Sequence, residues 1–236
     1  MSGIGLVDSY LKLGRAKKHM DALDALLKQF TGEKAYTLTR YDDLEQQRHC
    51  LKIKLHDVPD DICLTVGDLF YNMRSCLDQL VWSLAHRVGR ILDPDYTQFP
   101  VMESYHRGDA YKAHPLWRLD AMCNLDKHRR IPANGSEIIP TFSNLTRGEV
   151  WGIQPIGPGQ LAVEFPLDLR FQALDDCHIA SVPLAAKHKL QLDPRIPFKV
   201  NFGGDASGFT EDRSGIGDIY NFVEHAVLPK FLRFFP

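Results

Sequence analysis

The sequence has little of what marks a membrane protein or a secreted, disulfide-bonded protein. No run of about 18 apolar residues occurs, so no membrane span and no membrane partner are expected. The first residues lack a basic segment followed by an apolar one, so a signal peptide is not expected. The five cysteines are odd in number and form no CxxC, which indicates reduced thiols. Together these absences predict a cytoplasmic protein.

The common short signatures of catalysis and cofactor binding are also missing. The chain has no HExxH, no GxSxG, no P-loop and no GxGxxG between a strand and a helix. His106, His114 and Asp109 are the nearest approach to a metal set, and nothing completes their coordination. We therefore expect no metal and no cofactor. The net charge of −2 gives no overall attraction to nucleic acid, although a local basic patch is compatible with it.

The periodicity of apolar residues predicts both helices and strands. Helical spacing occurs in four stretches: 6–30, 67–85 (starting as early as 62, with Asp60 or Asp61 as a cap), 115–125 and 216–234. Alternation predicts a β-hairpin over 35–57 and later strands at 136–142, 149–155, 160–166, 178–184 and 196–202. Residues 203–215 are rich in turn-forming residues and are predicted to lack regular structure.

This order of elements predicts an α+β fold. The N-terminal, central and C-terminal helices would form a helical layer packed on a mostly antiparallel β-sheet. The length of 236 residues suits a single domain over 1–236. The alternative is a mainly helical part, 1–130, followed by a mainly β part with the C-terminal helix, 131–236.

The stretch from Gly67 to Ala85 has the strongest pattern in the chain. Its apolar stripe consists of Leu69, Met73, Cys76, Leu77, Leu80 and Leu84. The other side carries Asp68, Asn72, Ser75 and Gln79, flanked by Tyr71, Arg74, Asp78 and Trp82. A solvated face would normally be rich in Lys and Glu, and this face has neither. We therefore expect another segment to cover it at least in part, with its polar groups hydrogen-bonded.

Arg74 and Asp78 stand four residues apart, so they can pair along the helix. Two interpretations are open: a structural tie to a neighbouring segment, or part of a functional site.

A second cluster, Asp126, Lys127, His128 and Arg129, lies in the sequence LDKHRR. One interpretation is a basic helix end favoured by the helix dipole, with Asp126 in a local ion pair. The other is that this cluster faces Arg74 and Asp78 and forms an anion or phosphoester site. His128 would then be the general acid/base, and Arg74 or Arg129 would stabilise developing negative charge.

These two motifs carry a family resemblance. The run GDLFYNMRSCLDQLVWSLA followed by LDKHRR resembles an uncharacterised group of bacterial proteins that share GD-x-x-[HY]-N-x-RS-x-LD-x-LVW and a later LDKHR. This resemblance implies no particular activity. The central helix is also similar to HEPN-type helical ribonucleases, in which an Arg is followed by four to six residues and a His. Arg74 matches the Arg, but Gln79 stands where the His would be, and Gln cannot exchange protons. That similarity implies an inactive relative or one that uses another histidine, such as His128.

Three hypotheses about function follow. The first, which we favour, is a non-catalytic domain whose charged pocket binds a small anionic ligand or a partner protein through Arg74, Asp78, Asn72, Asp126, Lys127 and Arg129. The second is a metal-independent phosphodiesterase or ribonuclease with His128 as proton carrier, or a variant that binds RNA without cleaving it. The third is a self-associating regulatory protein, because the C-terminal sequence VLPKFLRFFP (227–236) is aromatic enough for an interface.

Overall fold

The computed structural model describes residues 6–33, 35–89, 98–101, 108–128, 131, 133–138, 177–184, 198–204 and 209–235. The chain divides into two compact units, each assembled from separated parts of the sequence. The first unit comprises Met1–Leu27, Pro59–Ala133 and Asn201–Pro236, and the second comprises Lys28–Val58 and Asn134–Val200.

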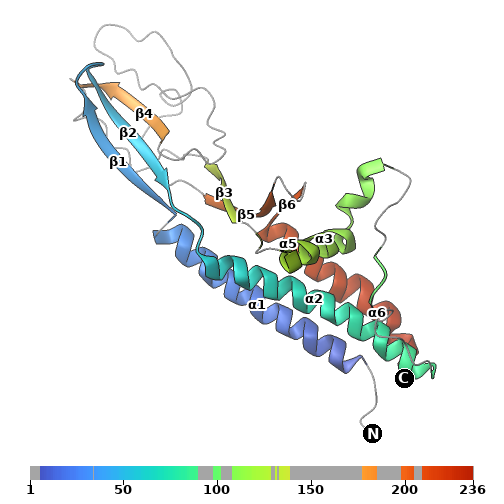
Figure 1. Cartoon of the computed structure of the whole chain (residues 1–236). Coiled ribbons are helices and arrows are strands. Elements are labelled where there is room, and N and C mark those ends of the chain that lie inside the picture. The colour runs from blue at the N-terminus through green and yellow to red at the C-terminus, as the bar shows by residue number, and fades with distance from the viewer. Residues whose placement is uncertain are drawn as a thin grey trace. The chain divides into compact units, whose positions relative to one another are not determined.

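Helices dominate the first unit (Figure 1). They are α1 (Val7–Glu33, whose last residues belong to the second unit), α2 (Asp60–Arg87), η2 (Gly108–Ala113), α3 (Pro115–His128) and α5 (Arg213–Asn221), followed by a π-helical turn η4 (Phe222–Val227), α6 (Leu228–Phe231) and η5 (Leu232–Phe234). Within the described residues, no helix combines the length and hydrophobicity needed to cross a membrane.

The apolar stripe predicted for the central helix forms much of the core. In α2, the side chains of Leu69, Met73, Cys76, Leu77 and Leu80 have no exposed surface. The helix is longer than 67–85, because it begins directly after Pro59. Asp60 and Asp61 therefore lie in its first turn rather than capping it, where the helix dipole stabilises their negative charge.

Strands form two small sheets, and the strand pairs described in register are antiparallel. Strands β1 (Tyr36–Asp43) and β2 (Arg48–Leu55) form the predicted hairpin, and β4 (Cys177–Pro183) pairs antiparallel with β2. The other sheet has the order β3 (Ala133–Ile138), β5 (Phe198–Gly204) and β6 (Phe209–Asp212), with β5 and β6 antiparallel. The α+β class is confirmed. The strands predicted at 149–155 and 160–166 lie outside the described residues.

The prediction that 203–215 lacks regular structure was wrong for all the described residues of this stretch, because 203–204 belong to β5 and 209–215 to β6 and α5. Residues 209–212 form β6, and α5 begins at Arg213, three residues before the predicted start. The Asp212 side chain caps α5 by accepting a hydrogen bond from the Gly215 N–H at 2.8 Å. Local composition hid both elements, because β6 depends on its pairing with β5 and a capping Asp also resembles a turn residue.

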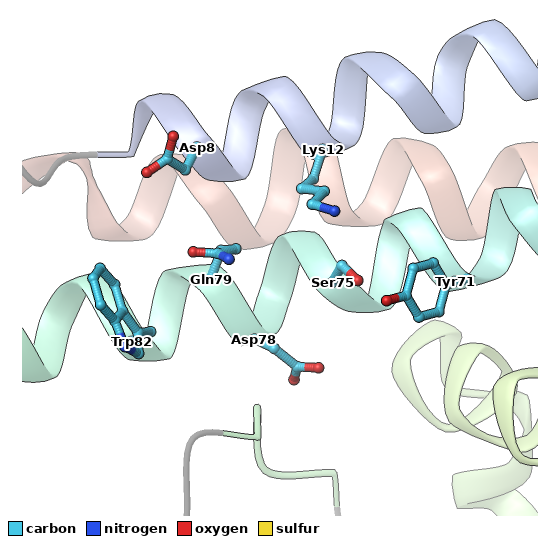
Figure 2. Close-up of a pocket in the computed structure, with 7 residues that line it drawn as sticks. All are labelled: Asp8, Lys12, Tyr71, Ser75, Asp78, Gln79 and Trp82. Carbon is cyan, nitrogen blue, oxygen red and sulfur yellow. The ribbon is translucent and has the colours of Figure 1, made fainter. Parts of the chain in front are cut away.

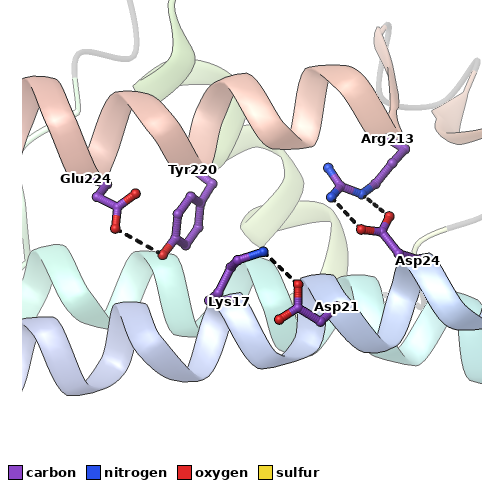
Figure 3. Close-up of polar contacts among 6 residues, drawn as sticks. All are labelled: Lys17, Asp21, Asp24, Arg213, Tyr220 and Glu224. Carbon is purple, nitrogen blue, oxygen red and sulfur yellow. Dashed lines mark hydrogen bonds and ion pairs between the residues drawn. The ribbon is translucent and has the colours of Figure 1, made fainter.

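Ion pairs fix the helices of the first unit against one another. Arg213 at the start of α5 makes two hydrogen bonds, of 2.5 and 2.8 Å, to the Asp24 carboxylate of α1 (Figure 3). These hydrogen bonds hold the pKa of Asp24 below its ordinary value. Arg118 of α3 forms a bidentate salt bridge with the buried Glu211 of β6. Hydrogen bonding to Glu211 raises the pKa of the Arg118 guanidinium. Helices α1, α3 and α5 are therefore held by contacts between residues far apart in sequence.

Candidate functional site

Arg74 and Asp78 of α2 together hold the backbone of one residue in the segment 98–101. The N–H of Phe99 donates to Asp78 Oδ1 at 2.8 Å, and Arg74 Nη2 donates to the Phe99 carbonyl at 2.9 Å. Arg74 Nε also lies 3.4 Å from Asp78 Oδ1. The polar face of α2 is thus covered by another segment at this point, as the sequence predicted.

Arg74 has a further partner on α3. Its Nη1 lies 3.0 Å from Asp120 Oδ1, which makes an ion pair but does not have the geometry of a hydrogen bond. The buried Nη1 atom therefore has no hydrogen-bond partner among the described residues. Only 12% of the Arg74 side chain is exposed. Because the guanidinium is engaged by two carboxylates and a carbonyl, this network matches the structural interpretation of the pair. We call Arg74, Asp78, Asp120 and Phe99 the Arg74 network.

Helix α3 runs antiparallel to α2 along this face. Asp120 meets Arg74, the Cys123 thiol lies 3.4 Å from the Phe70 carbonyl, and Asp126 lies against Gly67. A Cβ at Gly67 would stand 2.6 Å from Asp126 Oδ1. The two motifs that carry the family resemblance therefore do touch, although at Gly67 and Asp68 rather than at Arg74 and Asp78.

Asp126 sits in an unfavourable electrostatic environment. Burial raises the pKa of its carboxyl above the ordinary value, and the nearby charge of Asp68 adds to the effect. Two neighbouring carboxylates could attract a cation, but no group of three potential metal ligands occurs in the described part of the chain.

The remaining predicted site residues are dispersed. Asn72 donates its amide to the Asp68 carbonyl of its own helix at 2.7 Å. Lys127 is exposed, and Arg129 lies outside the described residues. His128 is the last residue of α3, eight positions beyond Asp120, and its side chain is not among those described. The helical rise places its backbone about 12 Å along α3 from the Arg74 contact.

Two buried thiols, Cys76 of α2 and Cys123 of α3, are poor nucleophiles. Burial raises the pKa of Cys76 to about 12 and that of Cys123 to about 12. Both are therefore protonated at neutral pH, and a thiol needs to be ionised to act as a nucleophile. These residues contribute to packing.

A pocket of about 490 Å³ lies beside the Arg74 network, between α1 and α2 (Figure 2). We call it the α1–α2 pocket. Its lining consists of Asp8 and Lys12 from α1 and Tyr71, Ser75, Asp78, Gln79 and Trp82 from α2. All five α2 residues belong to the polar face recognised in the sequence. The α1 residues were missed, although Asp8 and Lys12 stand four residues apart and so share one side of that helix.

Most polar groups around this pocket are unengaged. Asp8, Lys12, Ser75 and Gln79 make no ion pair or hydrogen bond within the described structure. Two large aromatic side chains flank them, with Tyr71 61% exposed and Trp82 38% exposed. The pocket thus offers free hydrogen-bonding groups, whereas the Arg74 guanidinium beside it is already paired.

Comparison with family models, curated proteins and solved structures found no match for the chain. The inference of function therefore depends on the geometry described above.

Proposed function

We propose that this chain is a non-catalytic binding protein that takes a small polar ligand in the α1–α2 pocket. The supporting observation is the set of unpaired polar groups, Asp8, Lys12, Ser75 and Gln79, between two exposed aromatic side chains. A pocket of about 490 Å³ is in the range that small ligands occupy. An anionic ligand, as the sequence suggested, is compatible with this pocket because Lys12 supplies a positive charge in its lining.

Binding is favoured over catalysis by the types of residue present. Among the described residues that line the pocket there is neither histidine nor cysteine, the side chains that most readily exchange protons or attack near neutral pH. Arg74, the group expected to stabilise an anionic transition state, is held by Phe99 and Asp120. The catalytic hypothesis needs His128 and Arg74 in one cleft, and the spacing along α3 disfavours that pairing.

A fragment screen by ligand-observed NMR tests this proposal. We expect a subset of polar fragments to bind the wild-type protein and to be lost from Ser75→Trp, because an indole at position 75 occupies the part of the pocket beside Lys12. Leu64→Trp is the matched control, since Leu64 is exposed on the same helix and outside the pocket. Circular dichroism verifies that both variants are folded. Fragments that bind equally to wild type and Ser75→Trp would contradict the proposal.

Self-association remains the second candidate function. Leu232 is 50% exposed and Phe234 is 43% exposed, both in η5 at the C-terminal end. Exposed apolar side chains that form a contiguous patch are typical of interfaces. Binding in the α1–α2 pocket and association through η5 use different residues, so the two functions are compatible.

A further inference from the structure

The α1–α2 pocket carries opposite charges at two positions along its length. In Figure 2, Asp8 lies over Gln79 and Trp82, whereas Lys12 lies over Ser75 and Tyr71. Four residues of α-helix separate the backbones of Asp8 and Lys12 by about 6 Å along the axis, and this rise sets the scale for the spacing of the two charges. The pocket is therefore negative at the Trp82 end and positive at the Tyr71 end.

These two charges are unpaired although their spacing favours pairing. An acidic residue four positions before a lysine has the better orientation for a helical ion pair. Asp8 and Lys12 nevertheless form no ion pair within the described structure, whereas Lys17 and Asp21 on the same helix, in the less favoured order, pair at 2.6 Å. Both charges of the pocket are thus available to a ligand.

The third charged residue of the lining is already compensated. Asp78 accepts the Phe99 N–H and lies next to the Arg74 guanidinium. The free charges of the pocket are consequently one negative and one positive. The Trp82 ring beside Asp8 contacts the His86 ring, with centroids 4.0 Å apart, and its remaining surface suits a cation. The hydroxyls of Tyr71 and Ser75 beside Lys12 are hydrogen-bond donors that suit an anion.

We infer that the α1–α2 pocket binds a zwitterion whose two charged groups stand about 6 Å apart. The ligand's ammonium lies against Asp8 and Trp82, and its carboxylate lies against Lys12. Dipeptides and ω-amino acids have this chemistry. The inference deepens the proposed function and rests on it, since it names the class of ligand for the same pocket.

Isothermal titration with 5-aminopentanoate provides the test, because its chain of five bonds between nitrogen and carboxyl carbon spans about 6 Å. Pentanoate and pentylamine carry one of the two charges each at nearly the same size. Exposed charge interactions are weak, so we expect the wild-type protein to prefer the zwitterion about fivefold over either analogue. Glycyl-glycine should behave like 5-aminopentanoate, since it has a similar charge separation.

Two variants assign each charge to its partner. In Asp8→Asn, pentanoate should bind as well as 5-aminopentanoate, because the ammonium has lost its partner. In Lys12→Met, pentylamine should bind as well as the zwitterion, because the carboxylate has lost its partner. Ser75→Trp should abolish all binding, and Leu64→Trp should leave it unchanged.

The outcomes separate the inference from the proposed function. A singly charged analogue that binds the wild type as tightly as the zwitterion, and is lost from Ser75→Trp, overturns the zwitterion inference and leaves the binding function intact. Absence of zwitterion binding up to on the order of 10 mM also overturns the inference. Fragments from the screen that are still lost from Ser75→Trp would then support the proposed function alone. Zwitterion binding that persists in Ser75→Trp contradicts both.

Discussion

Replacing Arg74 with methionine separates a structural role from a functional one. Methionine keeps much of the apolar volume of the arginine stem and removes the guanidinium. The variant loses the charged hydrogen bond to the Phe99 carbonyl and the ion pairs with Asp78 and Asp120. If Arg74 ties α2 to α3 and to segment 98–101, its loss should destabilise the protein without affecting a ligand in the neighbouring pocket.

The size of the effect follows from these contacts. A hydrogen bond to a charged group contributes about 1.5–3 kcal/mol. The ion pairs add less than about 1 kcal/mol each, because the Asp78 and Asp120 side chains are 33% and 23% exposed and solvent screens them. We expect a loss of about 2–3 kcal/mol in the free energy of unfolding. For a chain of this size, each kcal/mol lowers Tm by roughly 2–4 °C.

Urea denaturation followed by circular dichroism measures this loss, with unchanged m-value as the sign that only stability has altered. Arg15→Met is the matched control, because Arg15 is exposed on α1 and makes no contact of this kind in the described structure. Its effect should stay within about 0.5 kcal/mol. A stability change in Arg74→Met as small as in the control, together with loss of ligand binding, would refute the structural role.

Three further predictions concern other parts of the first unit. Gly67→Ala should be less stable than Gly14→Ala by about 1 kcal/mol, because the new Cβ at position 67 would stand 2.6 Å from Asp126 Oδ1 and displace that carboxylate, whereas a Cβ at position 14 meets nothing within 4 Å and should stabilise by up to about 1 kcal/mol; thermal unfolding distinguishes the two. Asp126→Asn should be more stable than wild type at neutral pH. Folding raises the pKa of Asp126, so ionising this carboxyl destabilises the wild-type protein at pH values above the folded pKa. The stability that Asp126→Asn gains over wild type should therefore shrink as the pH falls through the folded pKa, and it should vanish below the unfolded pKa near 3.8. Urea titrations at several pH values measure this difference. Light scattering should show a concentration-dependent dimer that Phe234→Ser weakens, if the exposed η5 residues form an interface; a monomer at every concentration removes that candidate.

Local periodicity in the sequence was sufficient to predict the helices and the first hairpin. The stripe of Leu69, Met73 and Leu77 follows helical spacing, and in the structure these side chains are fully buried. Cover over part of the polar face of α2 was predicted for a similar reason, because this face lacks Lys and Glu; it is found at Arg74 and Asp78, whereas Tyr71 is exposed and Ser75 and Gln79 make no hydrogen bond within the described residues. The segment that covers Arg74 and Asp78 could not be predicted, because both side chains bind the backbone N–H and carbonyl of Phe99, and backbone groups have no signature in the sequence.

The long-range contacts were beyond sequence reasoning. Arg213 pairs with Asp24 across 189 positions, and Arg118 pairs with Glu211 across 93. Nothing local distinguishes these charges from ordinary surface charges. The same limit explains the missed half of the pocket, because Asp8 and Lys12 acquire a role only when α1 lies beside α2.

The most direct test of the account is the affinity of Arg74→Met for 5-aminopentanoate, measured by titration on the folded variant beside wild type and Ser75→Trp. We expect a Kd within about threefold of wild type for Arg74→Met, a change of less than about 0.7 kcal/mol, and no binding to Ser75→Trp. Loss of binding from folded Arg74→Met, with binding retained by Ser75→Trp, would place the ligand at the Arg74 network and contradict the account.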